Sequence, residues 1–290
     1  MRRSSIPVGK PEQPRLAVRK MYKLFINGAF VRSESGRSDP ISDGKEFVAN
    51  IARGSRKDVR DAVVAARAAQ PKWWKTAPAT RGLILYRLAE MMEARRAEFV
   101  ERTCNEDEVT AAIDRVVWYA GWCDKFAALL STRNPVGGPH FNFSTAEPMG
   151  VVGMLAPDEP ALLGLVSVLM PALVAGNSIV LVASETDPRT AIVFAEALAT
   201  SDLPAGVANI ITGTRLELAP ILAKHMDVNA LAFVDGTQTA ELQRAAAQNV
   251  KRTRVLPARP GRDWFSAAAQ SLDDIAAYSE IKTIWHPAGI

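Results

Sequence analysis

The second half of the chain alternates between short apolar runs and stretches with helical periodicity. The runs are typical of buried strands and lie at Gly150–Leu155, Ser178–Val182, Val207–Thr212, Ala230–Val234 and Thr253–Leu256. The helices predicted between them end near Val174, Ala199, Lys224 and Asn249. Strands that alternate with helices favour a parallel sheet wound by right-handed crossovers. We therefore predict an α/β fold with a Rossmann-like parallel sheet flanked by helices.

The first half of the chain is mainly helical in its periodicity. Lys23–Arg32 is the exception, because its apolar residues alternate around Asn27-Gly28, a dipeptide typical of tight hairpins. One helix is predicted to begin after Ser55, which caps it together with Asp58. Further helices are predicted over residues 107–130 and from Thr80, with Leu83, Leu85, Leu88, Met91 and Met92 buried.

The two ends of the chain differ in character. Residues 1–20 are rich in Pro, Ser and Arg and have no periodicity, so we expect a disordered basic tail, with a docking arm as the alternative. Residues 134–147 are rich in turn formers and then strand-like. A short helix from about Asp273 and a strand over Glu280–Trp285 are predicted near the C-terminus.

Composition narrows the classes of function. Apolar residues make up 48% and charged residues 23% of the 290 residues, as in a globular protein with a sizeable core. The net charge of +4 comes largely from the basic tail, so no face for nucleic acid is predicted. The longest apolar run, residues 161–174, is too short to span a bilayer, and the N-terminus lacks the apolar core of a signal peptide. We expect a cytoplasmic protein without membrane contact.

Cysteine and histidine residues do not form a recognisable site in the sequence. Cys104 and Cys123 make no disulfide framework, and we expect both to be buried structural thiols. The histidines, His140, His225 and His286, are widely separated and fit no metal-ligand spacing. No metal site is predicted.

A series of stretches, in a fixed order, resembles the aldehyde dehydrogenase superfamily. They are LFINGAFVRSESGR, VRDAVVAARAAQPKW, LYRLAEMMEARRAEF, YAGWCDK, EPMGVVGMLAP, PALVAGNSIVL, LPAGVANIITG and DVNALAFVDGT. The stretch LDDIAAYSEIKTIW is similar to the family's C-terminal helix and oligomerisation strand. The APDEP turn and the LVASE strand end are most similar to the second, degenerate half of the two-headed family 16 members.

The resemblance implies a division of the chain into five segments. These are a disordered basic tail (1–20), the N-terminal helical part of the coenzyme domain (21–133), oligomerisation strands (134–148), the Rossmann-like nucleotide-binding core (149–262), and a C-terminal helix with an oligomerisation strand (263–290). In the family, a separate domain with the nucleophilic cysteine follows the last strand of the core. Here residues 260–271 are too few to hold it, so the resemblance implies a truncated member without a catalytic domain.

The family's catalytic residues have no counterparts at the matching positions. Glu159 stands where the family has the Asn whose amide donates to the oxyanion, and an ionised carboxylate cannot donate. Leu256 stands at the position of the general base. We expect Asp158 and Glu159 to cap the following helix, with a catalytic carboxylate pair as the alternative. No catalytic residue is predicted.

The resemblance implies only a vestigial cofactor site. Its predicted residues are Glu185, Gly213, Gly236 and Thr237. Val182 replaces the Lys that, with Glu185, holds the adenine ribose in the family. Asp235 would place its carboxylate in the pyrophosphate site and satisfy the helix amides itself. Arg215 is expected to be a solvated surface residue, with an anion-holding role as the alternative. We expect no cofactor, or NAD bound weakly at best.

Three functions are compatible with this pattern. The first is a non-catalytic structural or regulatory subunit, which assembles with itself or with a full-length aldehyde dehydrogenase through the C-terminal strand. The second is an NAD-dependent aldehyde dehydrogenase that is active only with a partner's catalytic domain. The third is a module that senses NAD without chemistry. The fold alone does not choose among them, because function depends on the site.

Overall fold

The structure is a computed structural model that describes residues 18–43, 46–258 and 261–288. Most of the predicted basic tail, residues 1–17, lies outside this described part. Its last two residues form ion pairs with the body. A guanidinium nitrogen of Arg19 lies 3.7 Å from a carboxylate oxygen of Glu46, and Nζ of Lys20 lies 2.7 Å from a carboxylate oxygen of Glu196.

A seven-stranded sheet forms the centre of the molecule, in the order β12-β11-β8-β9-β10-β2-β3. The parallel strands are β12 (Arg252–Leu256), β11 (Ala230–Val234), β8 (Val151–Leu155), β9 (Ser178–Val182) and β10 (Ala208–Ile211). The antiparallel hairpin of β2 (Leu24–Ile26) and β3 (Ala29–Val31) extends the sheet, and Asn27 and Gly28 turn it with φ of 53° and 74°. Both the predicted parallel sheet and the predicted hairpin are confirmed.

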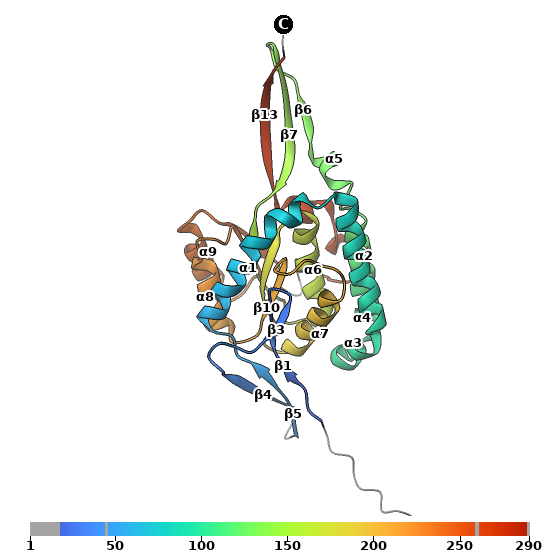
Figure 1. The fold of residues 1–290 in the computed structure, drawn as a ribbon, viewed down its shortest axis with the longest axis vertical. Helices are drawn as coiled ribbons and strands as arrows, with labels where there is room; N and C mark the ends of the chain where they lie inside the picture. The colour runs from blue at the N-terminus through green and yellow to red at the C-terminus, as the bar shows by residue number, and fades with distance from the viewer. Residues whose placement is uncertain (1–17, 44–45, 259–260, 289–290) are drawn as a thin grey trace, which may run out of the picture.

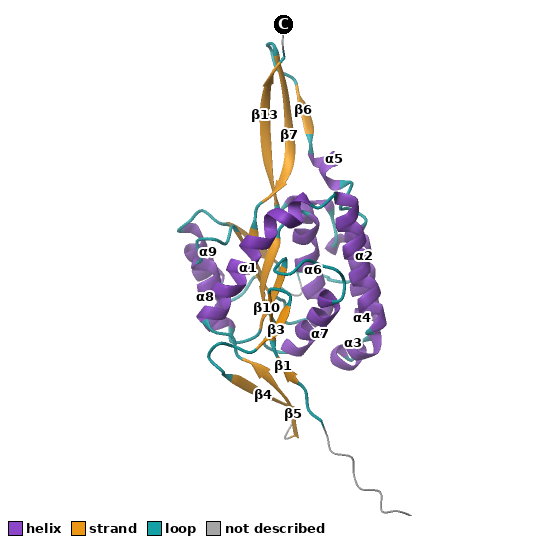
Figure 2. Ribbon diagram, viewed as in Figure 1, coloured by secondary structure: helices purple, strands orange, loops and turns teal. Residues whose placement is uncertain are grey.

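Helices cover both faces of this sheet (Figures 1 and 2). One layer contains α1 (Arg56–Lys75), α8 (Arg215–Lys224) and α9 (Thr239–Ala247). The other contains α6 (Ala161–Val174) and α7 (Pro188–Ala199), with α2 (Pro78–Ala94), α3 (Arg96–Thr103) and α4 (Glu106–Ala120) packed around them. Because a parallel sheet is buried on both faces, β8 and β9 are continuous apolar runs without alternation.

Residues 21–52 contain strands that the sequence pattern does not predict. β1 (Met21–Tyr22), β5 (Glu46–Ala52) and β4 (Ser38–Asp43) form a separate sheet in the order β1-β5-β4. The description of residues 21–133 as helical is therefore wrong for this segment. β4 contains Pro40 and acidic residues, which are depleted in strands, and an edge position tolerates them.

The helices after residue 55 agree with the predictions only in part, because five helices stand where three are predicted. The capping box of Ser55 and Asp58 is confirmed. However, α2 begins at Pro78 and not after Thr80, because the fixed φ of proline suits a first helical turn. Leu83 is 71% exposed and therefore not buried as predicted. The helix predicted over residues 107–130 is interrupted by a turn before α5 (Phe126–Leu130).

A third sheet, which we call the arm, consists of β6 (Thr132–Asn134), β7 (His140–Pro148) and β13 (Ser279–Pro287), with β7 in the centre. β13 pairs with β7 along its whole length, from Ser279 opposite Pro148 to Pro287 opposite His140. Figure 1 shows the arm projecting from one end of the body, with the end of β13 near its tip. The strands predicted in residues 134–148 and near the C-terminus are confirmed, and they belong to the same sheet.

The connection between β12 and β13 packs onto the body in its described residues, 257–258 and 261–278. It includes α10 (Leu272–Ala276), which agrees with the helix predicted from about Asp273. Its most deeply buried large side chains are Trp264, Ile275 and Tyr278. Asp274 ties the connection to the core, because its carboxylate pairs with Arg254 and accepts a hydrogen bond from the Tyr119 hydroxyl at 3.4 Å. The connection is therefore part of the hydrophobic core.

Truncation of Trp264 tests this packing. The side chain is 2% exposed, so Trp264→Ala should lower the free energy of unfolding by about 3–5 kcal/mol. The neighbouring Phe265 is 44% exposed and serves as a matched control, since Phe265→Ala should change the stability by about 0.5 kcal/mol or less. Urea denaturation of the two variants measures the difference, and equal losses would contradict a packed connection.

Candidate nucleotide cleft

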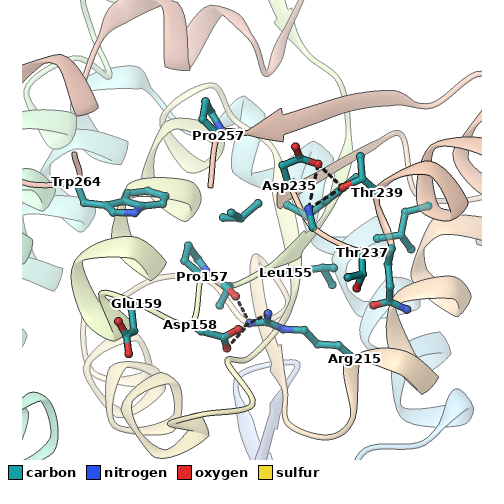
Figure 3. A pocket seen from close by; sticks show the side chains of 16 residues that line it. Leu155, Pro157, Asp158, Glu159, Arg215, Asp235, Thr237, Thr239, Pro257 and Trp264 are labelled. Carbon is teal, nitrogen blue, oxygen red and sulfur yellow. Dashed lines mark hydrogen bonds and ion pairs between the residues drawn. The ribbon is translucent and has the colours of Figure 1, made fainter. Parts of the chain in front are cut away.

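The order of the strands creates a cleft at the carboxyl ends of the central sheet. The chain passes from β8 to β9 and β10 on one side and then to β11 on the other side of β8. In parallel α/β sheets, such a reversal leaves a crevice where ligands commonly bind. A cleft of about 440 Å³ lies here, between the turn after β8 and the turn after β11, with Pro257 and Trp264 of the connection at its wall (Figure 3).

An ion pair between Asp158 and Arg215 crosses this edge of the sheet. Arg215 is the first residue of α8, and its two terminal nitrogens lie 2.8 and 2.9 Å from the two carboxylate oxygens of Asp158, in the turn after β8. The same guanidinium also donates to the carbonyl of Ala156, and the hydroxyl of Ser184, after β9, donates to Asp158 at 2.8 Å. A bidentate pair of this kind is strong and geometrically specific. Arg215 therefore binds an anion, which agrees with the alternative prediction for this residue. The anion is the Asp158 carboxylate of the same chain and not a ligand.

The predicted cofactor residues lie in two different clefts. Gly236 and Thr237 line the first cleft, and Glu185 and Gly213 line a second one of about 310 Å³. Arg215 lies between the two groups, because its backbone amide donates to the Glu185 carboxylate at 2.7 Å while its side chain binds Asp158. The structure thus keeps these residues near one edge of the sheet but does not bring them together in one cavity.

Asp235 satisfies only part of the role predicted for it. Its carboxylate accepts hydrogen bonds from the Gly236 amide at 3.0 Å and from the Thr239 hydroxyl at 2.6 Å. It bonds to no further amide of α9, whose capping residue Gln238 also provides no side-chain cap. Asp235 is exposed at the rim of the first cleft, so its charge faces any ligand that enters.

The prediction that Asp158 and Glu159 cap α6 is wrong. The amides of Leu162 and Leu163, in the first turn of α6, donate to one carboxylate oxygen of Glu108 at 2.7 and 3.1 Å. Glu108 is a buried residue of α4, so the cap comes from a distant helix that packs on α6. Asp158 is bound to Arg215, and Glu159 is exposed, so they do not form a carboxylate pair either.

The family of the chain follows from the sequence that forms this sheet. A model of the aldehyde dehydrogenase family matches residues 30–256, from the first hairpin to the end of β12. The chain belongs to the aldehyde dehydrogenase family. The resemblance noted in the sequence motifs is therefore confirmed, and the central sheet is the family's nucleotide-binding type of core.

Individual members of the aldehyde dehydrogenase family are similar over most of this chain. The 2-hydroxymuconic semialdehyde dehydrogenase of Pseudomonas sp. (strain CF600) is 35% identical over 80% of the chain, and the mitochondrial benzaldehyde dehydrogenase of Antirrhinum majus is 33% identical over 83%. These matches cover 51% and 48% of the two relatives, so the chain spans about half their length. An NAD+ complex of aldehyde dehydrogenase from Bacillus cereus superposes with a TM-score of 0.77 at 26% identity, over 82% of this chain and 51% of that protein.

No cysteine is among the described residues that line either cleft of this aldehyde dehydrogenase family member. Cys123 is buried as predicted, and burial raises the pKa of its thiol to about 12. Cys104 is exposed, which corrects the prediction that both thiols are buried. Its position differs from that of a core residue, because it is the C-cap of α3 and adopts a left-handed conformation with φ of 52°.

The histidines and the acidic residues do not form a metal site in the described part of the chain. His140 and His286 are exposed, and His225 follows α8 with its ring accepting from the Asp227 amide at 3.2 Å. Within residues 18–43, 46–258 and 261–288, no group of His, Cys, Asp and Glu could hold a metal ion. No helix of this part is long and apolar enough to cross a bilayer.

The Glu108 cap can be tested by its removal. Glu108→Ala leaves the buried amides of Leu162 and Leu163 without acceptors, so it should lower the free energy of unfolding by about 1–3 kcal/mol. Glu106, two residues earlier on the same helix and exposed, is the matched control, and Glu106→Ala should cost about 0.5 kcal/mol or less. Chemical denaturation compares the two, and an equal effect would show that the cap contributes little.

The two thiols should differ in reactivity. Only a thiolate reacts quickly with a thiol-specific reagent, so the raised pKa and burial of Cys123 should protect it in the native protein. Cys104 should react at once. Titration with a chromogenic disulfide at neutral pH should therefore release one equivalent per native chain, and both thiols should react only after denaturation. Rapid release of two equivalents from the native protein would contradict the buried position of Cys123.

Proposed function

We propose that this chain is a non-catalytic, truncated member of the aldehyde dehydrogenase family, most like the second half of the family 16 members. In this proposal it acts as a structural or regulatory subunit and assembles with itself or with a full-length aldehyde dehydrogenase through β13. A cytoplasmic location stays a prediction. The observation that carries the proposal is the ion pair of Asp158 and Arg215, which both line the cleft.

The charges around the cleft support weak or absent binding of an anionic dinucleotide. Asp158, Glu159 and Asp235 line it, and Arg215, the lining residue of opposite charge, already binds Asp158. A pyrophosphate that lay across the strand ends would have to break this ion pair. The negative carboxylate of Asp158 would then lie beside the negative charge of the pyrophosphate. Like charges brought together in this way are strongly unfavourable. The described residues therefore do not fit NAD well.

The cleft also lacks the groups that the family's reaction requires. Aldehyde oxidation needs a thiolate nucleophile, a donor to the oxyanion and a base. At the position of the family's oxyanion donor, Glu159 only accepts hydrogen bonds when it is ionised. At the position of the general base, Leu256 is a buried side chain without an exchangeable proton. Cys104 and Cys123 follow the ends of α3 and α4, and neither is among the described residues that line the cleft.

The packed connection supports the absence of a domain inserted between β12 and β13. Trp264 covers one wall of the cleft, and Asp274 is bonded to the core. A segment that loosely bridged a deletion would not bury these groups. Instead, residues 257–278 cover apolar surface at the place where the family continues into its catalytic domain.

One observation favours the alternative of an NAD-dependent aldehyde dehydrogenase completed by a partner. Glu185 is exposed in the second cleft beside Gly213, so part of the ribose-binding arrangement of the family is still accessible. The same residues would serve an NAD-sensing module. In both alternatives, NAD would bind with the ion pair of Asp158 and Arg215 displaced.

A turnover assay tests the proposed function. The purified chain is incubated with NAD and a panel of aliphatic and aromatic aldehydes, and NADH formation is followed by absorbance. We expect no NADH above the blank without protein, because the cleft lacks a nucleophile and a base. The assay is repeated with a full-length aldehyde dehydrogenase from the same source, as a positive control and as a candidate partner. Turnover by the chain alone would overturn the proposal.

A further inference from the structure

A third cleft, of about 690 Å³, lies between α1 and α8, which pack side by side in one helix layer (Figure 1). We call it the basic cleft, because four cations line it: Arg56, Lys57, Arg60 and Lys224. Lys224 ends α8, and Arg215 begins this ten-residue helix about 15 Å away along its axis. The basic cleft is therefore separate from the two clefts at the strand ends, and a ligand here is compatible with each function considered above.

The charge of the basic cleft has one sign. Arg56, Lys57 and Arg60 come from the N-terminal part of α1, and Lys224 comes from the last turn of α8. None of the described residues that line the cleft is acidic, in contrast to the first cleft with its three carboxylates. A concave surface lined by charges of one sign concentrates ligands of the opposite sign.

The cations of the basic cleft are available to a ligand. Within the described residues, Arg56 and Lys224 form no ion pair. Nζ of Lys57 lies 3.1 Å from a carboxylate oxygen of Glu34, and a guanidinium nitrogen of Arg60 lies 2.7 Å from a carboxylate oxygen of Asp61. Both pairs are exposed, and exposed pairs contribute little to stability. An anionic ligand can therefore replace these two carboxylates at small cost.

The cations on α1 also stand where the helix disfavours them. The N-terminus of a helix carries a partial positive charge, so cations are unfavourable there. Arg56 and Lys57 are nevertheless the first two residues of α1, and Arg60 follows one turn later. Asp58, the acidic residue of the first turn, is buried and bonded to Ser55 in the capping box. Residues that break a local rule without a compensating contact, as Arg56 does here, are expected at functional sites.

We propose that the basic cleft binds a linear oligophosphate, either free or carried on a nucleoside. Arg56 and Arg60 are four positions apart and so lie on the same face of α1. Their guanidinium groups suit the oxygens of phosphate, and Lys224 adds a point charge from the neighbouring helix. Pro220 and Ile221 give the cleft an apolar part, and its volume lies in the range of small-molecule sites.

Other phosphate-bearing molecules suit the basic cleft less well. NAD carries only singly charged phosphate diesters and a positive nicotinamide ring, so it offers less charge than an oligophosphate with a terminal phosphate group. Surfaces for single-stranded nucleic acid add aromatic rings on which bases stack. No Phe, Tyr or Trp is among the described residues that line this cleft, and its cations gather around one hollow instead of following a strand.

Calorimetric titration of the full chain with inorganic tripolyphosphate, without divalent metal, tests the site. We expect saturable binding in the micromolar range that weakens as salt is added. Arg56→Gln with Lys224→Gln should raise the dissociation constant about tenfold or more, because charge-assisted hydrogen bonds to phosphate are lost. Lys72→Gln with Lys75→Gln is the matched control. It removes the same charge at exposed positions from the other end of α1, so it should change the constant about twofold or less.

ATP in place of tripolyphosphate distinguishes the two carriers of the phosphate chain. Equal or weaker binding of ATP would identify the phosphate chain as the ligand, and tighter binding would indicate a nucleoside packed on Pro220 and Ile221. The absence of saturable heat with both probes, or an equal loss of affinity in the two double variants, would overturn the inference. Short duplex DNA that binds more tightly than both probes and depends on Arg56 and Lys224 would overturn it in favour of a nucleic-acid surface.

The titration of His225, which also lines the basic cleft, locates the ligand in the unaltered chain. Burial lowers the pKa of this imidazole, and the charges of Lys251 and Arg67 lower it further. A bound anion favours the charged ring, so tripolyphosphate should raise the pKa of His225. The pKa values of His140 and His286, on the arm, should not change. Proton NMR follows the three rings, with His225→Gln for assignment. No change at His225, or the same change at all three rings, would overturn the inference.

Discussion

The ion pair between Asp158 and Arg215 determines the shape of the candidate site. It joins the turn after β8 to the first residue of α8, and Ser184 after β9 supports the same carboxylate. Three strand ends are thereby held in one arrangement, and the predicted cofactor residues are divided between two clefts. In a parallel α/β sheet a dinucleotide would lie at this edge, so the ion pair occupies the space in which the fold would place the ligand.

The rest of the structure retains the packing of the family's core. The central sheet is buried on both faces, and α6 is enclosed on nearly all sides. The connection from β12 to β13 adds Trp264 and Asp274 to that core, and β13 completes the arm beside β7. Apolar burial and strand pairing are the interactions preserved, while the charged residues that line the cleft are mostly carboxylates.

The sequence predicts the sheet well because its strands obey simple rules. Strands buried on both faces are nearly continuous apolar runs, so β8, β9 and β11 are visible without a structure. β4 is not visible, since Pro40 and its acidic residues suit only an edge strand. The cleft is predicted only in part. Gly236 and Glu185 can be located from the motifs, but a side chain's partner depends on tertiary contacts. Two contacts show this: Arg215 binds Asp158, and Glu108 caps α6. Each joins residues more than fifty positions apart, and no local sequence pattern predicts such a pair.

The central claim is that the cleft of this aldehyde dehydrogenase family member is closed to the dinucleotide by its own charges. Calorimetric titration of the purified chain with NAD tests this claim most directly. The account predicts no saturable heat up to millimolar NAD, with a full-length aldehyde dehydrogenase as the positive control under the same conditions. Saturable binding with a dissociation constant in the micromolar range would contradict it.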